Sequence, residues 1–130
     1  MAYRRPNAFT ERVFNPLAMR FGLSGTEVLE VTGRRSGEPR RVPVIPLSHD
    51  GGRFLVSPRG ETQWVRNLRA TAGVCRLGPH GDVRPVRCEE VPPAEAGDVL
   101  EAYRVMAGRA VASHFRALPD SADHPVFRVS

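Results

Sequence analysis

The sequence predicts a single α+β domain in which a small β-barrel is covered by helices. Short apolar segments rich in β-branched residues recur along the chain, and turn residues separate them at hairpin distances. One helical segment interrupts these strands, and further helices follow toward the end of the chain. The connections between the first strands are too short for crossover helices, which argues against a parallel sheet.

Length and composition agree with one soluble domain. A chain of 130 residues buries enough surface to fold without disulfides or metals. We find no apolar run long enough to span a membrane and no leader at the N-terminus, so we expect a cytoplasmic protein. The two cysteines, Cys75 and Cys88, are too few and too far apart for a zinc site, and we expect buried, reduced thiols in neighbouring strands.

Residues 1–22 are predicted to form an amphipathic helix that packs on or beside the barrel. Between Asn7 and Phe21 the apolar side chains recur near helical spacing, and the predicted helix is basic. Asn7 is a suitable N-cap, whereas Pro16 should kink or split the helix. Weak contact with the inner face of a membrane is the alternative for this segment.

Turn residues divide the first half of the remaining chain into strands. Strands are predicted at 26–32, 40–47 and 53–57 because β-branched residues concentrate there. Pro43 and Pro46 place the second of these strands at a sheet edge or at a bulge. The Asp50-Gly51-Gly52 turn predicts a hairpin to the third.

The second half begins with a helix from residue 61 or 62 to about residue 70, since its apolar positions lie on one helical face. A short apolar strand at 74–77 and a longer alternating strand at 83–91 follow, and Pro92-Pro93 ends the longer one. Helical spacing then predicts helices at 93–106 and 110–118. The apolar segment 124–129 predicts a closing strand, which brings the total to about six mostly antiparallel strands.

The charge balance favours a small anionic ligand. All 19 basic residues are arginine, and the formal net charge is +5. An excess of positive charge attracts anions. We do not expect nucleic acid as a partner, because acidic residues are spread along the chain and no recognition-helix or aromatic-platform pattern occurs.

An arginine-rich turn is the strongest candidate for an anion site. Four arginines, Arg34, Arg35, Arg40 and Arg41, lie around Ser36 and Gly37 between two predicted strands. Backbone N–H groups in a glycine turn and guanidinium groups both bind phosphate or carboxylate oxygens. We expect Arg35, Ser36 and Arg40 to reach a ligand together, with Arg34 and Arg41 partly solvated. A solvated hairpin tip is the alternative.

A second candidate follows at the strand end, loop and helix start between Ser57 and Leu68. Free N–H groups at the helix N-terminus suit an anionic or carbonyl-rich ring system. Arg59 would add charge and Trp64 an aromatic wall. The alternatives are that Trp64 is the main core aromatic and that Asn67 is a buried amide that satisfies backbone groups.

We find no pattern typical of a hydrolase, a metal site or a nucleotide-binding loop. The four histidines lie far apart, mostly in or beside predicted turns. The sequence contains no convincing Ser-His-Asp order and no carboxylate pair of the kind used in acid–base catalysis. Any redox chemistry would therefore come from a bound cofactor.

Two segments together resemble the deazaflavin-dependent nitroreductase and quinone reductase family. The first is the string from Leu29 to Arg40, LEVTGRRSGEPR, and the second is WVRNLRA from Trp64 to Ala70. The Asp50-Gly51-Gly52 turn and a Ser/Gly loop lie between them. The similarity runs from about residue 7 to residue 91, and more weakly to the C-terminus.

The resemblance implies a split β-barrel, like that of the FMN-binding split-barrel proteins, which binds coenzyme F-420. This 8-hydroxy-5-deazaflavin carries a phosphodiester and a polyglutamate tail. Carried over by position, Arg35, Ser36, Gly37 and Arg40 would hold the phosphate and the tail. The loop from Ser57 to Gly60, Trp64 and Asn67 would border the ring. The implied cofactor-binding residues are Arg34, Arg35, Ser36, Gly37, Arg40, Ser57, Arg59, Gly60, Trp64 and Asn67.

The implied reaction is hydride transfer from the reduced deazaflavin to a small-molecule acceptor such as a quinone, a nitroaromatic or an activated enone. Tyr103 is a candidate for lining the acceptor pocket, and the favoured alternative is that it is a core aromatic. Two alternatives stay open, namely an FMN-binding split-barrel protein and a non-catalytic module that binds a cofactor or uses its basic surface. The sequence leaves open whether the protein is a monomer or a homodimer.

Overall fold

The structure, a computed structural model, describes residues 25–130. The predicted N-terminal helix at 1–22 lies outside the described residues and stays a prediction. Seven strands are described: β1 (Glu27–Thr32), β2 (Pro39–Val44), β3 (Leu47–His49), β4 (Gly52–Val56), β5 (Val74–Gly78), β6 (Arg84–Val91) and β7 (Val126–Val129). The α-helices are α2 (Gln63–Ala70), α3 (Gly97–Ala107) and α4 (Arg109–Ala117), with 3₁₀ turns η1 (Pro93–Glu95) and η2 (Ser121–Asp123).

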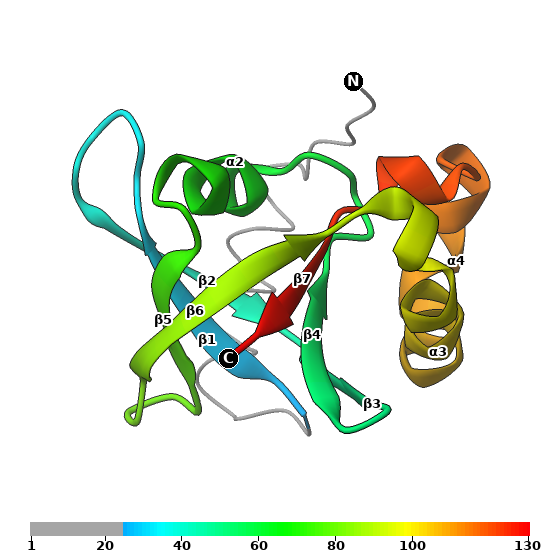
Figure 1. Ribbon diagram of the computed structural model, residues 1–130, viewed down its shortest axis with the longest axis horizontal. Coiled ribbons are helices and arrows are strands. Elements are labelled where there is room, and N and C mark those ends of the chain that lie inside the picture. Colours follow the sequence, from blue (N-terminus) through cyan, green and yellow to red (C-terminus); the bar gives the residue numbers. More distant parts are fainter. Residues whose placement is uncertain (1–24) are drawn as a thin grey trace.

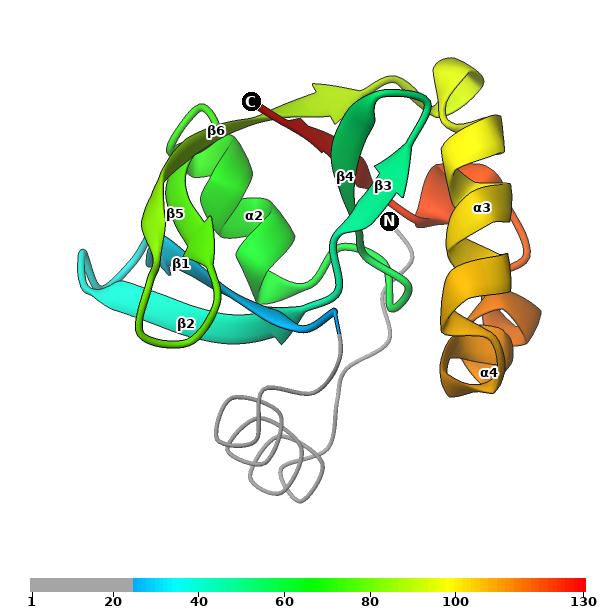
Figure 2. The same ribbon diagram turned by 90° about the horizontal axis from the view of Figure 1, so that it is seen from below.

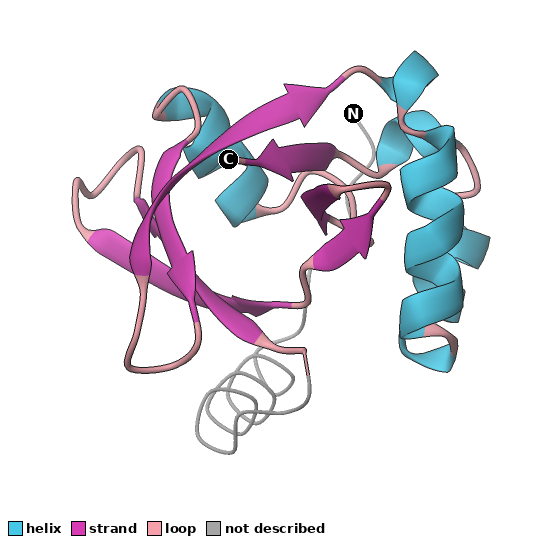
Figure 3. Cartoon of the chain, turned by 60° about the horizontal axis from the view of Figure 1, so that its bottom comes forward, coloured by secondary structure: helices cyan, strands magenta, loops and turns pink. Residues whose placement is uncertain are grey.

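The strands form one antiparallel sheet that curls into a half-barrel, with the strand order β2-β1-β5-β6-β7-β4-β3 (Figures 1 and 3). The two edge strands, β2 and β3, are joined by only Ile45 and Pro46. Because consecutive Cα atoms are about 3.8 Å apart, so short a link brings the two edges of the sheet close together. The sheet must therefore curl, and the predicted α+β split-barrel class is confirmed.

The prolines in the predicted strand at 40–47 mark a sheet edge, and they also mark a break in that strand. The predicted strand at 40–47 is divided into β2 and β3 around Pro46, so the sheet has one strand more than the expected six. β2 lies at the sheet edge, as its prolines predicted, since an edge strand does not need every N–H for pairing. Likewise, the predicted helix at 93–106 begins with the separate turn η1 before α3 starts at Gly97.

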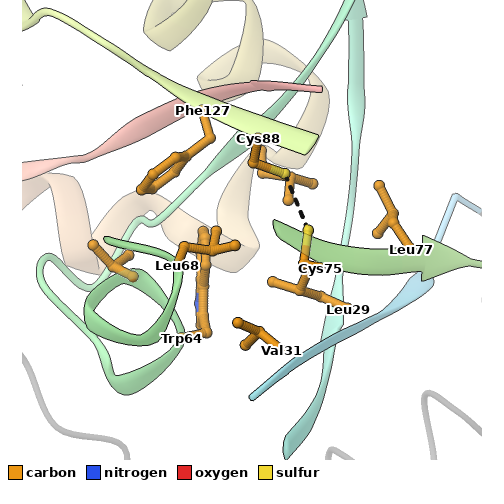
Figure 4. Packing of buried hydrophobic residues seen from close by; sticks show 10 residues of the cluster. Leu29, Val31, Trp64, Leu68, Cys75, Leu77, Cys88 and Phe127 are labelled. Carbon is orange, nitrogen blue, oxygen red and sulfur yellow. Dashed lines mark hydrogen bonds between the residues drawn. The ribbon is translucent and has the colours of Figure 1, made fainter. Parts of the chain in front are cut away.

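Helix α2 lies in the concave side of the curled sheet and closes one core (Figures 2 and 4). Its apolar face meets inward side chains of β1, β5, β6 and β7 because the strand side chains alternate between the two faces. The buried members of this first cluster are Leu29, Val31, Leu55, Trp64, Val65, Leu68, Cys75, Leu77, Cys88 and Phe127.

A second core lies outside the curl, where α3 and α4 pack beside β3 and β4 (Figure 2). Leu47, Phe54 and Val56 from the strands meet Val99, Leu100 and Tyr103 of α3. The predicted helices at the end of the chain are thus covers for one side of the barrel, as expected. The cleft described below is built from the first core and the β1–β2 turn.

Candidate functional site

A cleft of about 430 Å³ opens between the β1–β2 hairpin and the first half of α2. Its walls come from segments far apart in the sequence, which the curl of the sheet brings together. The described residues that line it are Val31, Gly33, Arg34, Arg35, Ser36, Arg40, Arg41, Val42, Arg59, Thr62, Gln63, Trp64 and Asn67.

The β1–β2 turn is held in one shape by its own backbone. Gly33 N–H donates to the Glu38 carbonyl at 2.8 Å, and Gly37 N–H donates to the Gly33 carbonyl at 2.9 Å. Ser36 Oγ accepts from Glu38 N–H at 3.2 Å. Gly37 has φ +72°, a conformation that glycine adopts without strain. The arginines around this turn are therefore presented from a fixed frame.

Strand register decides which arginine of β2 faces the cleft. Arg40 is paired with Val31, a core residue, whereas Arg41 is paired with Glu30. Directly opposed residues of an antiparallel pair share a face of the sheet. Accordingly, Arg41 Nε donates to Glu30 Oε2 at 2.9 Å. Arg40 and Arg41 therefore project to opposite faces of the sheet, although Arg41 still contributes to the cleft wall.

Two arginines at the cleft have guanidinium groups that are not used in contacts among the described residues. Among residues 25–130, Arg35 and Arg40 have no hydrogen-bond or ion-pair partner, and both are exposed. Five of the described lining residues are arginines, and none is Asp or Glu. Such a lining attracts negative charge and offers no carboxylate that would compete for the arginines.

Asn67 ties the arginine turn to α2. Its Oδ1 accepts from Arg34 N–H at 3.1 Å and from Arg34 Nη1 at 2.9 Å. The Asn67 side chain is buried, and its Nδ2 has no partner among the described residues. Arg34 is therefore half-buried and turned toward the helix. The Asn67 Nδ2 group keeps its two N–H donors available beside the cleft.

The floor of the cleft is apolar. Val31 is buried on β1, Val42 is half-buried on β2, and Trp64 is 9% exposed on α2. The Trp64 ring packs on Phe127 with their centroids 5.9 Å apart and a tilt of 52°. Trp64 is thus a core aromatic, as one of the two alternatives held, and it also lines the cleft.

The N-terminus of α2 opens onto the same cleft. Thr62 is the N-cap residue, but its side chain makes no capping hydrogen bond and its Oγ1 lies 3.3 Å from Ser57 Oγ. The first-turn N–H groups therefore keep their donor capacity, and no acidic side chain lies in the first turn. Arg59, from the preceding loop, adds a positive charge to this end of the cleft.

Seven of the ten cofactor-binding residues implied by the resemblance line the cleft, and three do not. Gly37 lies at the tip of the β1–β2 turn. Ser57 is fully buried behind the cleft, where its Oγ donates to the Gly60 carbonyl. Ser57 and Gly60 thereby shape the loop that carries Arg59.

Tyr103 belongs to the second core rather than to the described lining of the cleft. Burial raises its pKa to about 12, and the positive charge of Arg59 offsets part of that rise. The structure therefore places Tyr103, the candidate for lining the acceptor pocket, in the core between α3 and the strands.

Six residues that line the cleft are not among the cofactor-binding residues predicted from the sequence: Val31, Gly33, Arg41, Val42, Thr62 and Gln63. The valines carried no signal of their own, because only the hairpin register shows that Val31 and Val42 share the inward face with Arg40. Thr62 and Gln63 carried the ordinary signal of a helix start.

The family model described as F420H(2)-dependent quinone reductase matches residues 2–115. Among curated proteins, none matches the chain in sequence.

Solved structures share the fold at low sequence identity. A structure described as an F420-H2 dependent reductase (FDR-A) is 22% identical, with a TM-score of 0.59 over 82% of this chain and 95% of that one. A structure described as a domain-swapped dimer is 19% identical, with a TM-score of 0.55 over 94% of each chain. HutZ from Vibrio cholerae, described as a heme storage protein, is 14% identical, with a TM-score of 0.54 over 88% of this chain and 87% of that one.

Because the fold is shared by proteins described with different cofactors, the fold alone does not choose among them. The family match rests on the sequence itself and spans nearly the whole chain. The chain belongs to the F420H2-dependent quinone reductase family, and it is an oxidoreductase with a split-barrel fold.

Proposed function

We propose that this protein transfers a hydride from reduced coenzyme F-420 to a quinone, a nitroaromatic or an activated enone. The observation that carries the proposal is the combination of an apolar floor with an arginine rim in one cleft. A ligand that matches both must have a flat, largely apolar ring system and an anionic appendage. The deazaflavin cofactor has this chemistry.

The residues present fit such a cofactor in two parts. Arg35 and Arg40, which lack partners among the described residues, would bind the phosphate and tail carboxylates. The ring would lie along Trp64, with the Asn67 amide and the first-turn N–H groups of α2 as donors to its carbonyl oxygens. Arg34, held by Asn67, would fix the distance between the two parts.

When bound, the reduced deazaflavin supplies the hydride. The protein would orient the ring, shield one face of it from water and leave the other face open to the acceptor. None of the described lining residues is Asp, Glu, His, Cys or Tyr. We therefore propose that the proton that completes reduction of the acceptor comes from water at the mouth of the cleft.

The decisive experiment titrates the purified protein with oxidised F-420 and, separately, with FMN. Saturable quenching of deazaflavin fluorescence with no response to FMN is expected. Saturable FMN binding without F-420 binding would instead identify an FMN-binding split-barrel protein. Salt-sensitive DNA binding with neither cofactor bound would favour the basic-surface module.

Turnover is tested next with reduced F-420 and a soluble quinone. The return of deazaflavin fluorescence, faster than in a protein-free control, is the expected result. Tight F-420 binding without turnover of a quinone, a nitroaromatic or an enone would show a cofactor-binding protein that is not a reductase.

The other partner proposals are less specific. A homodimer is compatible with the similar structure described as a domain-swapped dimer, and a monomer stays the alternative. Helices long and apolar enough to cross a membrane are absent from the part of the chain that the structure describes. We propose a cytoplasmic protein, with contact to the inner membrane face through residues 1–22 as a further proposal.

A further inference from the structure

Two thiols meet in the first core, outside the cleft. Cys75 on β5 and Cys88 on β6 have their Sγ atoms 3.5 Å apart, within hydrogen-bonding distance (Figure 4). Their residues are 6% and 3% exposed. They are the only cysteines of the chain, so each has a single intramolecular partner for a disulfide.

The strand pairing holds both thiols on the same face of the sheet. Cys75 is paired with Val86, and Cys88 lies two residues further along β6. Cys88 N–H donates to the Gly73 carbonyl at 2.9 Å, which extends the pairing beyond the end of β5. A disulfide requires the two sulfur atoms to come to about 2.05 Å, so the present gap must close by about 1.5 Å.

One member of the pair, Cys88, lines a hollow at the protein surface. Beside the C-terminal end of α2, a hollow of about 290 Å³ is lined in part by Cys88, Gly73, Leu68 and Phe127. The hydrogen bond between the thiols also lowers the pKa of Cys75, because it stabilises the thiolate. A thiolate is the reactive form of cysteine.

The pair is also connected to the cleft by packing. Cys75 and Cys88 belong to the same buried cluster as Trp64 and Val31, and these two residues line the cleft (Figure 4). Close-packed interiors transmit small displacements to their neighbours. A movement of the sulfur atoms by about 1.5 Å should therefore be felt at the indole ring.

We propose that Cys75 and Cys88 form a redox-sensitive pair, which a peroxide converts into a disulfide, and that this change alters the packing of Trp64 at the cleft. In the first step the Cys75 thiol gives up its proton and the thiolate attacks a peroxide oxygen; the O–O bond breaks, a sulfenic acid forms, and the leaving hydroxide takes up that proton as water. The Cys88 thiol then displaces the hydroxyl group as a second water and forms the S–S bond. Two electrons and two protons pass from the thiols to the peroxide.

The test treats the native full-length protein with hydrogen peroxide, blocks the remaining thiols and digests with trypsin. Cleavage beside arginine yields the peptides 70–76 and 88–104, which contain the two cysteines and no methionine. Methionine oxidation therefore does not obscure the result. The expected product is these two peptides joined by a disulfide within one chain, and it should disappear on reduction.

Trp64 is the only tryptophan of the chain. Its fluorescence therefore reports, without any cofactor, whether disulfide formation alters the packing of the indole ring. Its emission should change on oxidation and return on reduction, whereas the variant Cys75→Ala/Cys88→Ala should not respond to peroxide. A linkage that forms only in urea-unfolded protein, or only between chains, would overturn the proposal. An unchanged Trp64 emission after complete disulfide formation would overturn the link to the cleft.

Discussion

At the scale of single residues, the capacity of the cleft to bind an anion depends on which of its arginines already have a hydrogen-bond or ion-pair partner within the protein. Arg41 is bound by Glu30 and Arg34 is bound by Asn67, whereas Arg35 and Arg40 have no partner among residues 25–130. A guanidinium group without a protein partner can bind an anion without breaking an existing hydrogen bond or ion pair. We therefore expect the energetic contribution to be concentrated in Arg35 and Arg40 rather than shared evenly by five arginines.

Replacing Arg40 with alanine tests this directly. Loss of one charge-assisted contact should weaken F-420 binding by about 1–3 kcal/mol. The measurement is a fluorescence titration at fixed ionic strength. The matched control is Arg84→Ala, which removes the same charge from an exposed pair with Asp82, away from the cleft, and should leave the affinity unchanged. Equal affinities for Arg40→Ala and the wild type would contradict the proposed anion site.

Tyr103 makes stability depend on pH in the alkaline range. Burial raises its pKa from 10 to about 12, so the unfolded chain loses this proton at lower pH than the folded protein does. The stability that depends on neutral Tyr103 is complete below pH 10 and falls as the pH rises from 10 to about 12. By linkage, the loss reaches about 2–3 kcal/mol.

Urea unfolding at several pH values measures this effect. The Tyr103→Phe variant carries no ionisable group at this position and should show a shallower alkaline decline than the wild type. If both proteins lose stability in parallel between pH 10 and 12, Tyr103 is not the group responsible.

At the scale of elements, α2 is the part whose placement matters most, because it contributes to both the core and the cleft. Its C-terminal end is fixed to β6 by Arg69, which donates to Glu90 at 2.9 and 2.7 Å and to Glu61 at 2.7 Å. These contacts, with that to Glu90 the strongest, raise the pKa of Arg69. Gly73 then makes the close turn from α2 into β5, with φ +84°.

Gly73→Ala should destabilise the protein by about 2–5 kcal/mol, through overpacking and an unfavourable backbone conformation together. A Cβ atom at this position would lie 1.9 Å from the Cys88 carbonyl oxygen, which belongs to the backbone of β6. Chemical unfolding measures the loss. Gly81→Ala is the matched control, because φ is +90° there but a Cβ would meet no atom within 4 Å. Equal losses of unfolding free energy in the two variants would show that the backbone conformation, and not the contact with Cys88, causes the destabilisation.

At the scale of the whole molecule, binding in the cleft joins parts that are distant in the chain. The β1–β2 turn and α2 are about thirty residues apart, and both belong to the first core through Val31 and Trp64. A ligand that contacts both should therefore stabilise the folded barrel as a unit. Because the unfolded chain does not assemble this cleft, binding adds to the free energy of unfolding.

We expect F-420 at about 100 times its Kd to stabilise the protein by about 2.7 kcal/mol. For a chain of this length, that corresponds to a rise in Tm of about 10 °C. Thermal unfolding with and without the cofactor measures it, and FMN at the same concentration should leave the Tm unchanged. A rise of Tm with FMN and none with F-420 would reverse the assignment of the cofactor.

The sequence by itself determined the parts of this protein that depend on local pattern. Alternation and turn residues predicted the strands, and helical spacing predicted α2 and α3. Glycine with arginine predicted a turn at Arg35 and Arg40, and anion binding there stays a prediction. The family could also be identified from sequence, because two short motifs occur in a fixed order. These features are encoded within a few neighbouring residues and do not depend on what the distant chain does.

The tertiary structure alone decided which of those residues meet. Ser57 and Gly60 lie in a promising loop, yet they face inward, whereas Val31 and Val42 looked like ordinary strand residues and form the cleft floor. The contact of Cys75 with Cys88 likewise required the register of β5 and β6. The physical reason is that side-chain direction and long-range pairing follow from strand register and sheet curl, and both are set by packing across the whole barrel.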